Sequence, residues 1–219
     1  HECSSAASDV YKRQENDELL GAASCTTNAI VPTLKVLNDE FDIQSGHIES
    51  VHSYTNDQNL IDNFHKKVRR GRSAALNMVI TETGAGKAVG QVLPELKGKL
   101  TANAVRVPTP NVSLAIINLR FAKDITLEEL NDFLRQKAFH SDLKEQIGFT
   151  NSPEVVSTDF VGDRHAGIID SAATIVNGNK CVLYVWYDNE FGYTAQLLGL
   201  AKEMVGLTYQ RYPNFSEST

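Results

Sequence analysis

Strand-like segments outnumber helix-like segments along this chain, and that balance most restricts the folds open to it. Residues 46–54 alternate in strand fashion and place His52 late on the strand. Residues 112–121 form an apolar run that is typical of a buried strand. Residues 174–176 and 180–187 are separated by a short turn and predict a hairpin. The sequence therefore predicts an α+β domain with a mainly antiparallel mixed sheet and helices packed on one face.

The turns and helices follow from local signals. Asn177 and Gly178 tolerate the positive φ that a tight hairpin turn requires. Residues 29–41 have apolar side chains at helical spacing, and Thr126 opens a second helix with a capping box. A third helix is predicted from about Tyr193 to Met204. Its apolar positions are Leu197, Leu200, Ala201 and Met204. A short strand is also expected over residues 18–23, and residues 105–107 are expected to lead into a turn.

Composition excludes several classes of protein. Of the 219 residues, 42% are hydrophobic and 22% are charged, which is typical of a soluble globular chain and not of a disordered one. No apolar run approaches the roughly 18 residues of a membrane helix. The formal net charge of −6 makes nucleic-acid binding unlikely. Three cysteines without metal-ligand spacing indicate a reducing, cytoplasmic setting and predict no metal site.

Cys25 is the residue with the clearest chemical potential. It lies where a predicted strand meets a predicted helix, and the free amides of a helix N-terminus favour a thiolate. The same amides would hold the oxyanion that forms when sulfur attacks a carbonyl. A lone cysteine is more often a small buried hydrophobe. Its polar neighbours Ser24, Thr26, Thr27 and Asn28 instead suit an anion at a helix N-terminus.

Seven separated motifs resemble the glyceraldehyde-3-phosphate dehydrogenase family, in the family's order. They are ASCTTNA from Ala23, HSYTNDQ from His52, RRGR from Arg69, TGAGKAV from Thr83, LPELKGKL from Leu93, RVPTPNVS from Arg106 and WYDNEFGY from Trp186. The resemblance covers about residues 15–207. It implies a catalytic domain over residues 15–207, followed by a C-terminal tail (residues 208–219). Residues 1–14 have neither helical nor strand periodicity and are expected to be a disordered or non-native leader.

The resemblance also implies a reaction. Cys25 would be the nucleophile and His52 its base, although a histidine on a strand is otherwise more often a hydrogen-bonded core residue. The thiolate would attack the aldehyde of glyceraldehyde 3-phosphate, and oxidation by NAD or NADP would leave a thioester. Inorganic phosphate would then release an acyl phosphate.

The family pattern divides the remaining polar residues among three binding sites. Thr55 and Arg106 resemble the substrate-phosphate site. Asn189 resembles the residue that holds the nicotinamide carboxamide. The residues that resemble the inorganic-phosphate site are Ser24, Thr26, Arg70, Thr83 and Gly84. Residues 56–72, in isolation a solvated loop, would line the coenzyme pocket of a neighbouring subunit in a homotetramer.

The family's Rossmann coenzyme domain is absent from this chain. Gly84, Gly86 and Gly90 do not replace it, because their spacing differs from G-x-G-x-x-G and no buried strand or βαβ unit is expected around them. We therefore expect a fragment that is inactive alone. The alternatives are an erythrose-4-phosphate dehydrogenase, a thiol hydrolase, or a non-catalytic fragment that assembles or binds nucleic acid through residues 66–72.

Overall fold

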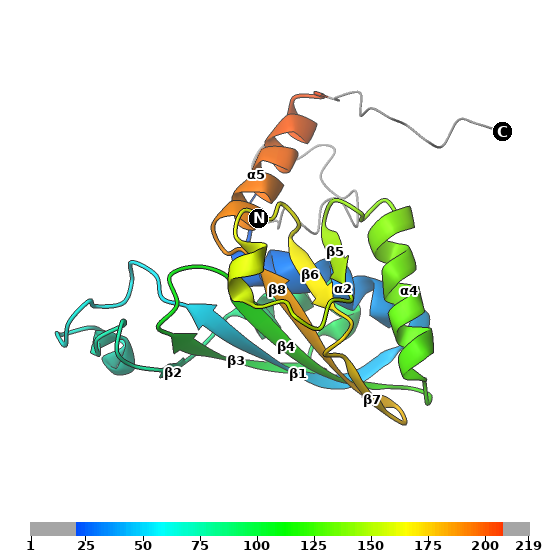
Figure 1. Ribbon diagram of the computed structural model, residues 1–219, viewed down its shortest axis with the longest axis horizontal. Coiled ribbons are helices and arrows are strands. Elements are labelled where there is room, and N and C mark those ends of the chain that lie inside the picture. The colour runs from blue at the N-terminus through cyan, green and yellow to red at the C-terminus, as the bar shows by residue number, and fades with distance from the viewer. Residues whose placement is uncertain (1–20, 208–219) are drawn as a thin grey trace.

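One mixed sheet organises the molecule, and a computed structural model describes residues 21–207 of it (Figure 1). The strand order is β2-β3-β1-β4-β8-β6-β5, and β7 pairs with β8. The pairs β1–β3 and β5–β6 are parallel, whereas all the others are antiparallel. The strands are β1 (Ile43–Ser53), β2 (Val79–Thr81), β3 (Leu100–Val107), β4 (Ser113–Phe121), β5 (Ile147–Thr150), β6 (Gly167–Asp170), β7 (Ile175–Asn177) and β8 (Lys180–Tyr187). The predicted fold class is confirmed.

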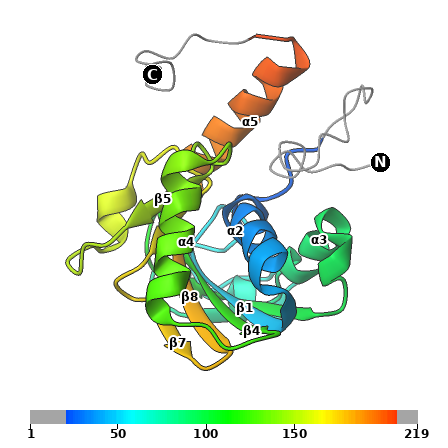
Figure 2. The same ribbon diagram turned by 90° about the vertical axis from the view of Figure 1, so that its right-hand side faces the viewer.

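Helices cover one face of this sheet (Figure 2). Along β4, Ala115, Ile117 and Leu119 are buried under the helices while the intervening residues are more exposed, as the two-residue period of a strand requires. The α-helices are α2 (Cys25–Phe41), α3 (Ala85–Val92), α4 (Leu127–His140) and α5 (Phe191–Met204). Short 3₁₀ turns are η1 (Val68–Gly71), η2 (Pro94–Leu96) and η3 (Ser157–Phe160). No helix within residues 21–207 has the length and apolarity to cross a bilayer.

Helix α2 begins four residues earlier than the sequence spacing predicted. Ala23 adopts a left-handed φ of 53°, and the Ser24 hydroxyl then caps the helix by accepting from the Thr27 amide at 3.1 Å. The first turn is polar, so apolar periodicity could not reveal it. Cys25 is consequently the first residue of α2 and not a residue of the preceding loop.

The connection from β1 to β3 corrects the expectation that no βαβ unit exists. These two strands are adjacent and parallel, and α3 lies in the segment that joins them. A short strand, β2, does precede the glycine segment. It lies at the sheet edge and is antiparallel to β3, so Gly84 and Gly86 still lack the strand-to-helix context of a dinucleotide fingerprint.

Two further local predictions need correction. The hairpin turn consists of Gly178 and Asn179, because Asn177 pairs with Lys180, and Gly178 supplies the positive φ of 60°. Helix α5 begins at Phe191 and projects from the body (Figure 1), with only Gly192 and Leu200 buried.

The capping box at Thr126 is confirmed. The predicted leader (1–14), the tail (208–219) and most of the predicted strand over 18–23 lie outside the described residues.

Candidate active site

The first turn of α2 and the end of β1 bring Cys25 and His52 together. His52 lies on the helix-facing side of β1 and is only 6% exposed. Its Nε2 is 3.4 Å from the Cys25 Sγ, within the range of a hydrogen bond to sulfur. The sequence placed these residues 27 positions apart, and the fold makes them neighbours.

Strand register supplies the next residue. His52 and Arg106 are Cα partners across the parallel β1–β3 pair, so their side chains leave the sheet on the same face. The Arg106 Nη1 is 3.0 Å from the His52 Nδ1 and 3.1 Å from the Ser53 carbonyl oxygen. The His52 Nδ1 is also 2.7 Å from that carbonyl oxygen. His52 therefore faces sulfur with one ring nitrogen and an arginine and a carbonyl with the other.

Burial sets the protonation state of this pair. Burial, followed by the positive charge of Arg106, lowers the pKa of His52 to about 4, so the imidazole is neutral at neutral pH. Burial also raises the pKa of the Cys25 thiol, although hydrogen bonds from Thr26 and the charge of Arg106 oppose that shift. The expectation that the helix N-terminus favours a thiolate is wrong here, because desolvation outweighs it. The pair is therefore a thiol beside a neutral imidazole.

Tyr187 is a buried neighbour that sequence reasoning missed. Its hydroxyl is 2.9 Å from the Thr26 Oγ1 and 2.8 Å from the Ser50 Oγ, so it joins α2 to β1 just beneath the reactive pair. Its ring lies edge-on to His52 with centroids 6.0 Å apart. The period-two pattern of the apolar strand at 180–187 could have placed Tyr187 on the helix-covered face.

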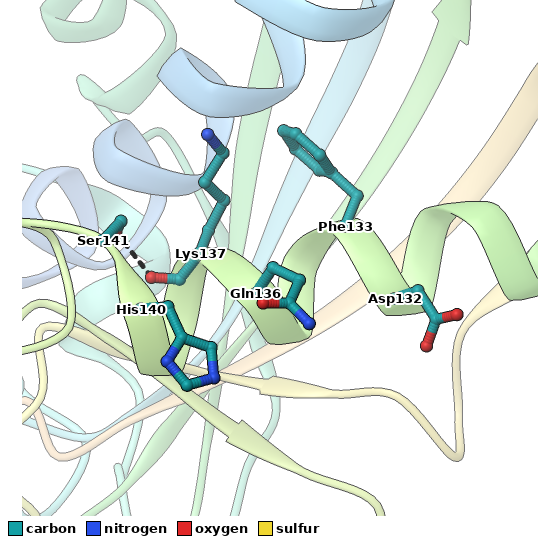
Figure 3. Close-up of a pocket in the computed structure, with 6 residues that line it drawn as sticks. All are labelled: Asp132, Phe133, Gln136, Lys137, His140 and Ser141. Atoms are coloured by element: carbon teal, nitrogen blue, oxygen red, sulfur yellow. Dashed lines mark hydrogen bonds between the residues drawn. The ribbon is translucent and has the colours of Figure 1, made fainter. Parts of the chain in front are cut away.

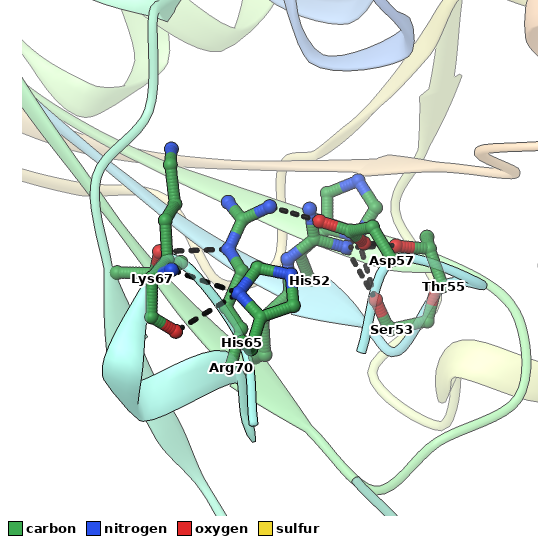
Figure 4. Close-up of polar contacts among 9 residues, drawn as sticks. His52, Ser53, Thr55, Asp57, His65, Lys67 and Arg70 are labelled. Atoms are coloured by element: carbon green, nitrogen blue, oxygen red, sulfur yellow. Dashed lines mark hydrogen bonds and ion pairs between the residues drawn. The ribbon is translucent and has the colours of Figure 1, made fainter. Parts of the chain in front are cut away.

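Four polar side chains form one cluster (Figure 4): one comes from β3, two from the loop after β1 and one from η1. The Arg106 Nη1 donates to the Thr55 Oγ1 at 3.0 Å. The Thr55 hydroxyl donates to the Asp57 carboxylate, and Arg70 forms an ion pair with the same carboxylate. Burial opposes ionisation of Asp57, but Thr55 and Arg70 together lower its pKa. Thr55 and Arg70 were predicted to bind two different phosphates, and both contact the Asp57 carboxylate. The sequence did not reveal this connection.

The other predicted phosphate ligands are distributed around this cluster. Arg70 also donates from Nε to the Thr81 Oγ1 at 3.0 Å, which places it beside β2. Thr83 accepts from the Ala85 amide at the start of α3, with Gly84 as its N-cap residue. The Ser24 hydroxyl caps α2, and the Thr26 hydroxyl is buried against Tyr187. The Thr26 side chain is therefore directed into the core and is not brought into the polar cluster.

Asn189 lies beside the same strands with a defined orientation. Its Oδ1 accepts from the Ser53 and Ser113 hydroxyls at 2.8 and 3.0 Å, while its Nδ2 is 3.3 Å from a Glu190 carboxylate oxygen. The buried Asp188 carboxylate accepts from the Glu190 and Phe191 amides and so fixes the start of α5. Two serines thus hold the amide oxygen, and the amide nitrogen donates one of its two hydrogens to Glu190.

A separate hollow of about 410 Å³ lies along α4, outside this site (Figure 3). All of its lining residues come from α4 and its C-cap: Asp132, Phe133, Gln136, Lys137, His140 and Ser141. The Lys137 ammonium lies 5.1 Å from the centre of the Phe133 ring. No predicted site residue contributes to this hollow. Within residues 21–207 there is also no cluster of three or more His, Cys, Asp or Glu side chains that could hold a metal ion.

The geometry places a cysteine thiol beside a histidine ring nitrogen, with Arg106 and Arg70 close by, an arrangement that suits nucleophilic attack by sulfur. Residues 24–189 match the family described as the C-terminal domain of glyceraldehyde 3-phosphate dehydrogenase. The chain belongs to this family, and the predicted family resemblance is confirmed.

Similar proteins extend over most of this chain. A glyceraldehyde-3-phosphate dehydrogenase-like protein of Pseudomonas aeruginosa (strain UCBPP-PA14) is 64% identical over 198 residues, covering 90% of this chain and 43% of the relative. Glyceraldehyde-3-phosphate dehydrogenase of Priestia megaterium is 47% identical over 85% of this chain and 56% of its own length. Glyceraldehyde-3-phosphate dehydrogenase 1 of Bacillus subtilis is 47% identical over 85% and 55%. The chain thus spans about half the length of the curated relatives it matches.

Proposed function

We propose that this chain is the catalytic domain of a phosphorylating, NAD- or NADP-dependent glyceraldehyde-3-phosphate dehydrogenase. The observation that carries the proposal is the 3.4 Å contact between the Cys25 Sγ and the His52 Nε2, one side chain away from Arg106. A thiol that donates its proton as it attacks, next to a fixed cation, suits an aldehyde that carries a phosphate group.

In the proposed reaction, Cys25 transfers its proton to the His52 Nε2 while sulfur bonds to the aldehyde carbon. His52 then returns this proton to the carbonyl oxygen, which becomes the hydroxyl of the hemithioacetal, and takes the same proton back in the oxidative step. A bound nicotinamide dinucleotide supplies the hydride acceptor. Inorganic phosphate then attacks the thioester carbon, the carbon–sulfur bond breaks, and an acyl phosphate leaves Cys25 as a thiolate.

Substrate and attacking phosphate need separate cationic contacts. Arg106 and Thr55 suit the substrate phosphate, because they are hydrogen-bonded to each other and Arg106 also contacts His52. Arg70 with Thr83 and Gly84 suits inorganic phosphate, because they lie at β2 and the start of α3. Ser24 and Thr26 were expected to join that second site. Their hydroxyls already form hydrogen bonds within the protein. We therefore propose that these two residues contribute to the second site only by forming the polar first turn of α2, and not by contacting phosphate.

The hydrogen bonds of Asn189 indicate whether its side chain could bind the nicotinamide carboxamide of the coenzyme. Ser53 and Ser113 occupy its amide oxygen and Glu190 takes one N–H, so the second N–H of the amide is left to donate to a carboxamide carbonyl. The described residues form no Rossmann domain, and we expect the 219-residue chain to be inactive as a dehydrogenase by itself. The whole protein would act in glycolysis or gluconeogenesis in the cytoplasm.

The loop after β1 supports the proposal of a homotetramer. Leu60, Phe64 and Val68 are between 76% and 90% exposed on this loop, although they are large and apolar. Exposed apolar clusters of this kind mark protein contacts. We assign this loop to the coenzyme pocket of a neighbouring subunit.

One half of the reaction can be tested in the 219-residue chain without coenzyme. In the reverse direction, the Cys25 thiolate attacks the acyl phosphate of 1,3-bisphosphoglycerate, inorganic phosphate leaves, and a 3-phosphoglyceryl thioester forms. Intact-mass measurement and peptide mapping should locate this adduct on Cys25, and added phosphate should remove it. Cys25→Ser should abolish the adduct, whereas Cys181→Ser should retain it.

The two arginines should separate in the same assay. Arg106→Ala should slow formation of the thioester by about ten- to a hundredfold, the loss expected for one charge-assisted contact. Arg70→Ala should mainly slow its removal by phosphate. If 1,3-bisphosphoglycerate leaves Cys25 unmodified while iodoacetamide still alkylates it, the proposed reaction is wrong.

A further inference from the structure

Arg106 and His52 make a contact that a simple phosphate-binding arginine would not need. The Arg106 Nη1 lies 3.0 Å from the His52 Nδ1, and that nitrogen is also 2.7 Å from the Ser53 carbonyl oxygen. A guanidinium has only donors, and a carbonyl oxygen is only an acceptor. One ring nitrogen cannot accept from the first and donate to the second at the same time.

The two possibilities correspond to the two neutral tautomers of His52. If Nδ1 accepts from Arg106, the ring proton is on Nε2 and points at the Cys25 sulfur, so Nε2 cannot take the thiol proton. If Nδ1 carries the proton and donates to the Ser53 carbonyl, Nε2 has the free lone pair that a base requires. Arg106 also donates to that carbonyl at 3.1 Å. The first arrangement brings two acceptors to 2.7 Å and the second brings two donors to 3.0 Å, so each has one unfavourable contact.

We propose that Arg106 is a positioning residue that controls His52: without an anion it holds the tautomer with Nε2 protonated, and a bound phosphate group draws it off Nδ1. Nδ1–H then donates to the Ser53 carbonyl, and Nε2 becomes able to accept the Cys25 proton. The proton moves between the two ring nitrogens through solvent, and no bond to carbon or sulfur changes. This inference rests on the proposed phosphate site at Arg106 and Thr55.

The surroundings of Arg106 make this movement feasible. Its Nε is buried without a hydrogen-bond partner, so the guanidinium has an unused donor for an incoming oxyanion. The Thr55 hydroxyl accepts from the Arg106 Nη1 at 3.0 Å and donates to Asp57, so an incoming anion would compete with that carboxylate. A doubly charged anion bound at the guanidinium would form charge-assisted bonds that are stronger than the contact of Arg106 with a neutral ring.

The charged groups around His52 also change its pKa, and an anion bound at Arg106 should make His52 a stronger base. Cys25 from α2 and Tyr187 from β8 are uncharged at neutral pH, so the charged groups that act on the ring are Arg106, Arg70 and Asp57. The charge of Arg106 is second only to burial in lowering the pKa of His52. Neutralising that charge with an anion should therefore strengthen His52 as a base while also selecting the useful tautomer.

Ring-nitrogen NMR of the ¹⁵N-labelled 219-residue chain tests the proposal, because the shifts of Nδ1 and Nε2 distinguish the tautomers. The probe is sulfate, which does not titrate near neutral pH, with chloride added to keep ionic strength constant. Without sulfate, His52 should be protonated on Nε2, and saturating sulfate should move the proton to Nδ1. Arg106→Gln should show the Nδ1-protonated form without sulfate. Arg120→Gln, which removes an exposed charge at the far end of β4, should respond like the unmodified chain.

Alkylation provides a second readout with a distinctive sign. If Arg106 acts through His52, sulfate should increase the rate at which neutral iodoacetamide alkylates Cys25, by about tenfold for each pKa unit that His52 gains. If Arg106 only stabilises the thiolate directly, sulfate should decrease that rate. Unchanged His52 nitrogen shifts, when Thr55 and Arg106 resonances show that sulfate binds, would overturn the coupling and leave the phosphate site intact. Absence of any sulfate effect on Thr55 and Arg106 would overturn both.

Discussion

The neutral, buried state of His52 should make this protein lose stability in mild acid. The folded state lowers the pKa of His52 from 6.5 to about 4. Below pH 6.5 the unfolded chain binds a proton at this residue that the folded chain does not, so unfolding becomes more favourable as pH falls. The loss develops between pH 6.5 and 4 and is complete below the folded-state pKa.

The size of this loss follows from the two pKa values. Linkage gives about 2 kcal/mol of lost stability between about pH 7.5 and 5, rising to about 3 kcal/mol near pH 4. His52 is 6% exposed, so solvent screens this effect little. The substitution His52→Gln removes the titration and should remove the corresponding part of the pH dependence.

Urea unfolding of the unmodified chain and the His52→Gln variant, at about pH 7.5 and 5, measures the effect as a difference of differences. His165→Gln is the matched control, and its effect on the pH dependence of stability should have the opposite sign. Its hydrogen bond with Asp163 raises the pKa of His165, so the stability from this pair is full below pH 6.5 and lost as pH rises through the raised pKa. If His52→Gln leaves the pH dependence unchanged, His52 is not held neutral and its assigned role as a base fails.

Three further predictions concern the thiols, the packing under α2 and the buried hydroxyl. Iodoacetamide at neutral pH, followed by peptide mapping, should label Cys25 well before Cys181, because burial raises the pKa of Cys181 to about 12; equal labelling would contradict this. Gly167→Ala places a methyl group 2.6 Å from a carbonyl oxygen of α2 and should cost about 1–3 kcal/mol in urea unfolding. The control Gly199→Ala, in open space on α5, should stabilise by about 0.5–1 kcal/mol. Tyr187→Phe should cost about 1–3 kcal/mol, since two buried hydroxyls lose their shared partner, and an unchanged unfolding midpoint would count against this network.

The sheet could be predicted from sequence because its strands alternate clearly. The apolar run of β4 and the pattern of β1 predicted both strands within a few residues, and the capping box predicted where α4 begins. The first turn of α2 and the exposed face of α5 were not predictable from period alone. A polar first turn carries no apolar spacing, and an apolar helical face does not reveal whether anything covers it.

Some features of the candidate site could likewise be predicted from the sequence, and others could not. Motif resemblance predicted Cys25, His52 and Arg106, and the structure brings these three together. The sequence did not predict the direction of the Cys25 pKa shift, because it cannot weigh helix amides against desolvation. It also missed Asp57 and Tyr187, whose roles depend on contacts made across the fold.

The register of the β1–β3 pair is the step that turns these separate residues into a site. His52 faces Arg106 only in this register, and a slip of one residue would move His52 to the opposite face of the sheet, away from Cys25. Ile48 and Ser50 lie on the same face as His52 and are buried, so the packing of the core resists that slip. The burial that fixes the register is also what holds His52 neutral. Stability of the sheet and basicity of His52 are therefore two consequences of one arrangement, and a substitution that loosens β1 should raise the pKa of His52 as it lowers the stability of the fold.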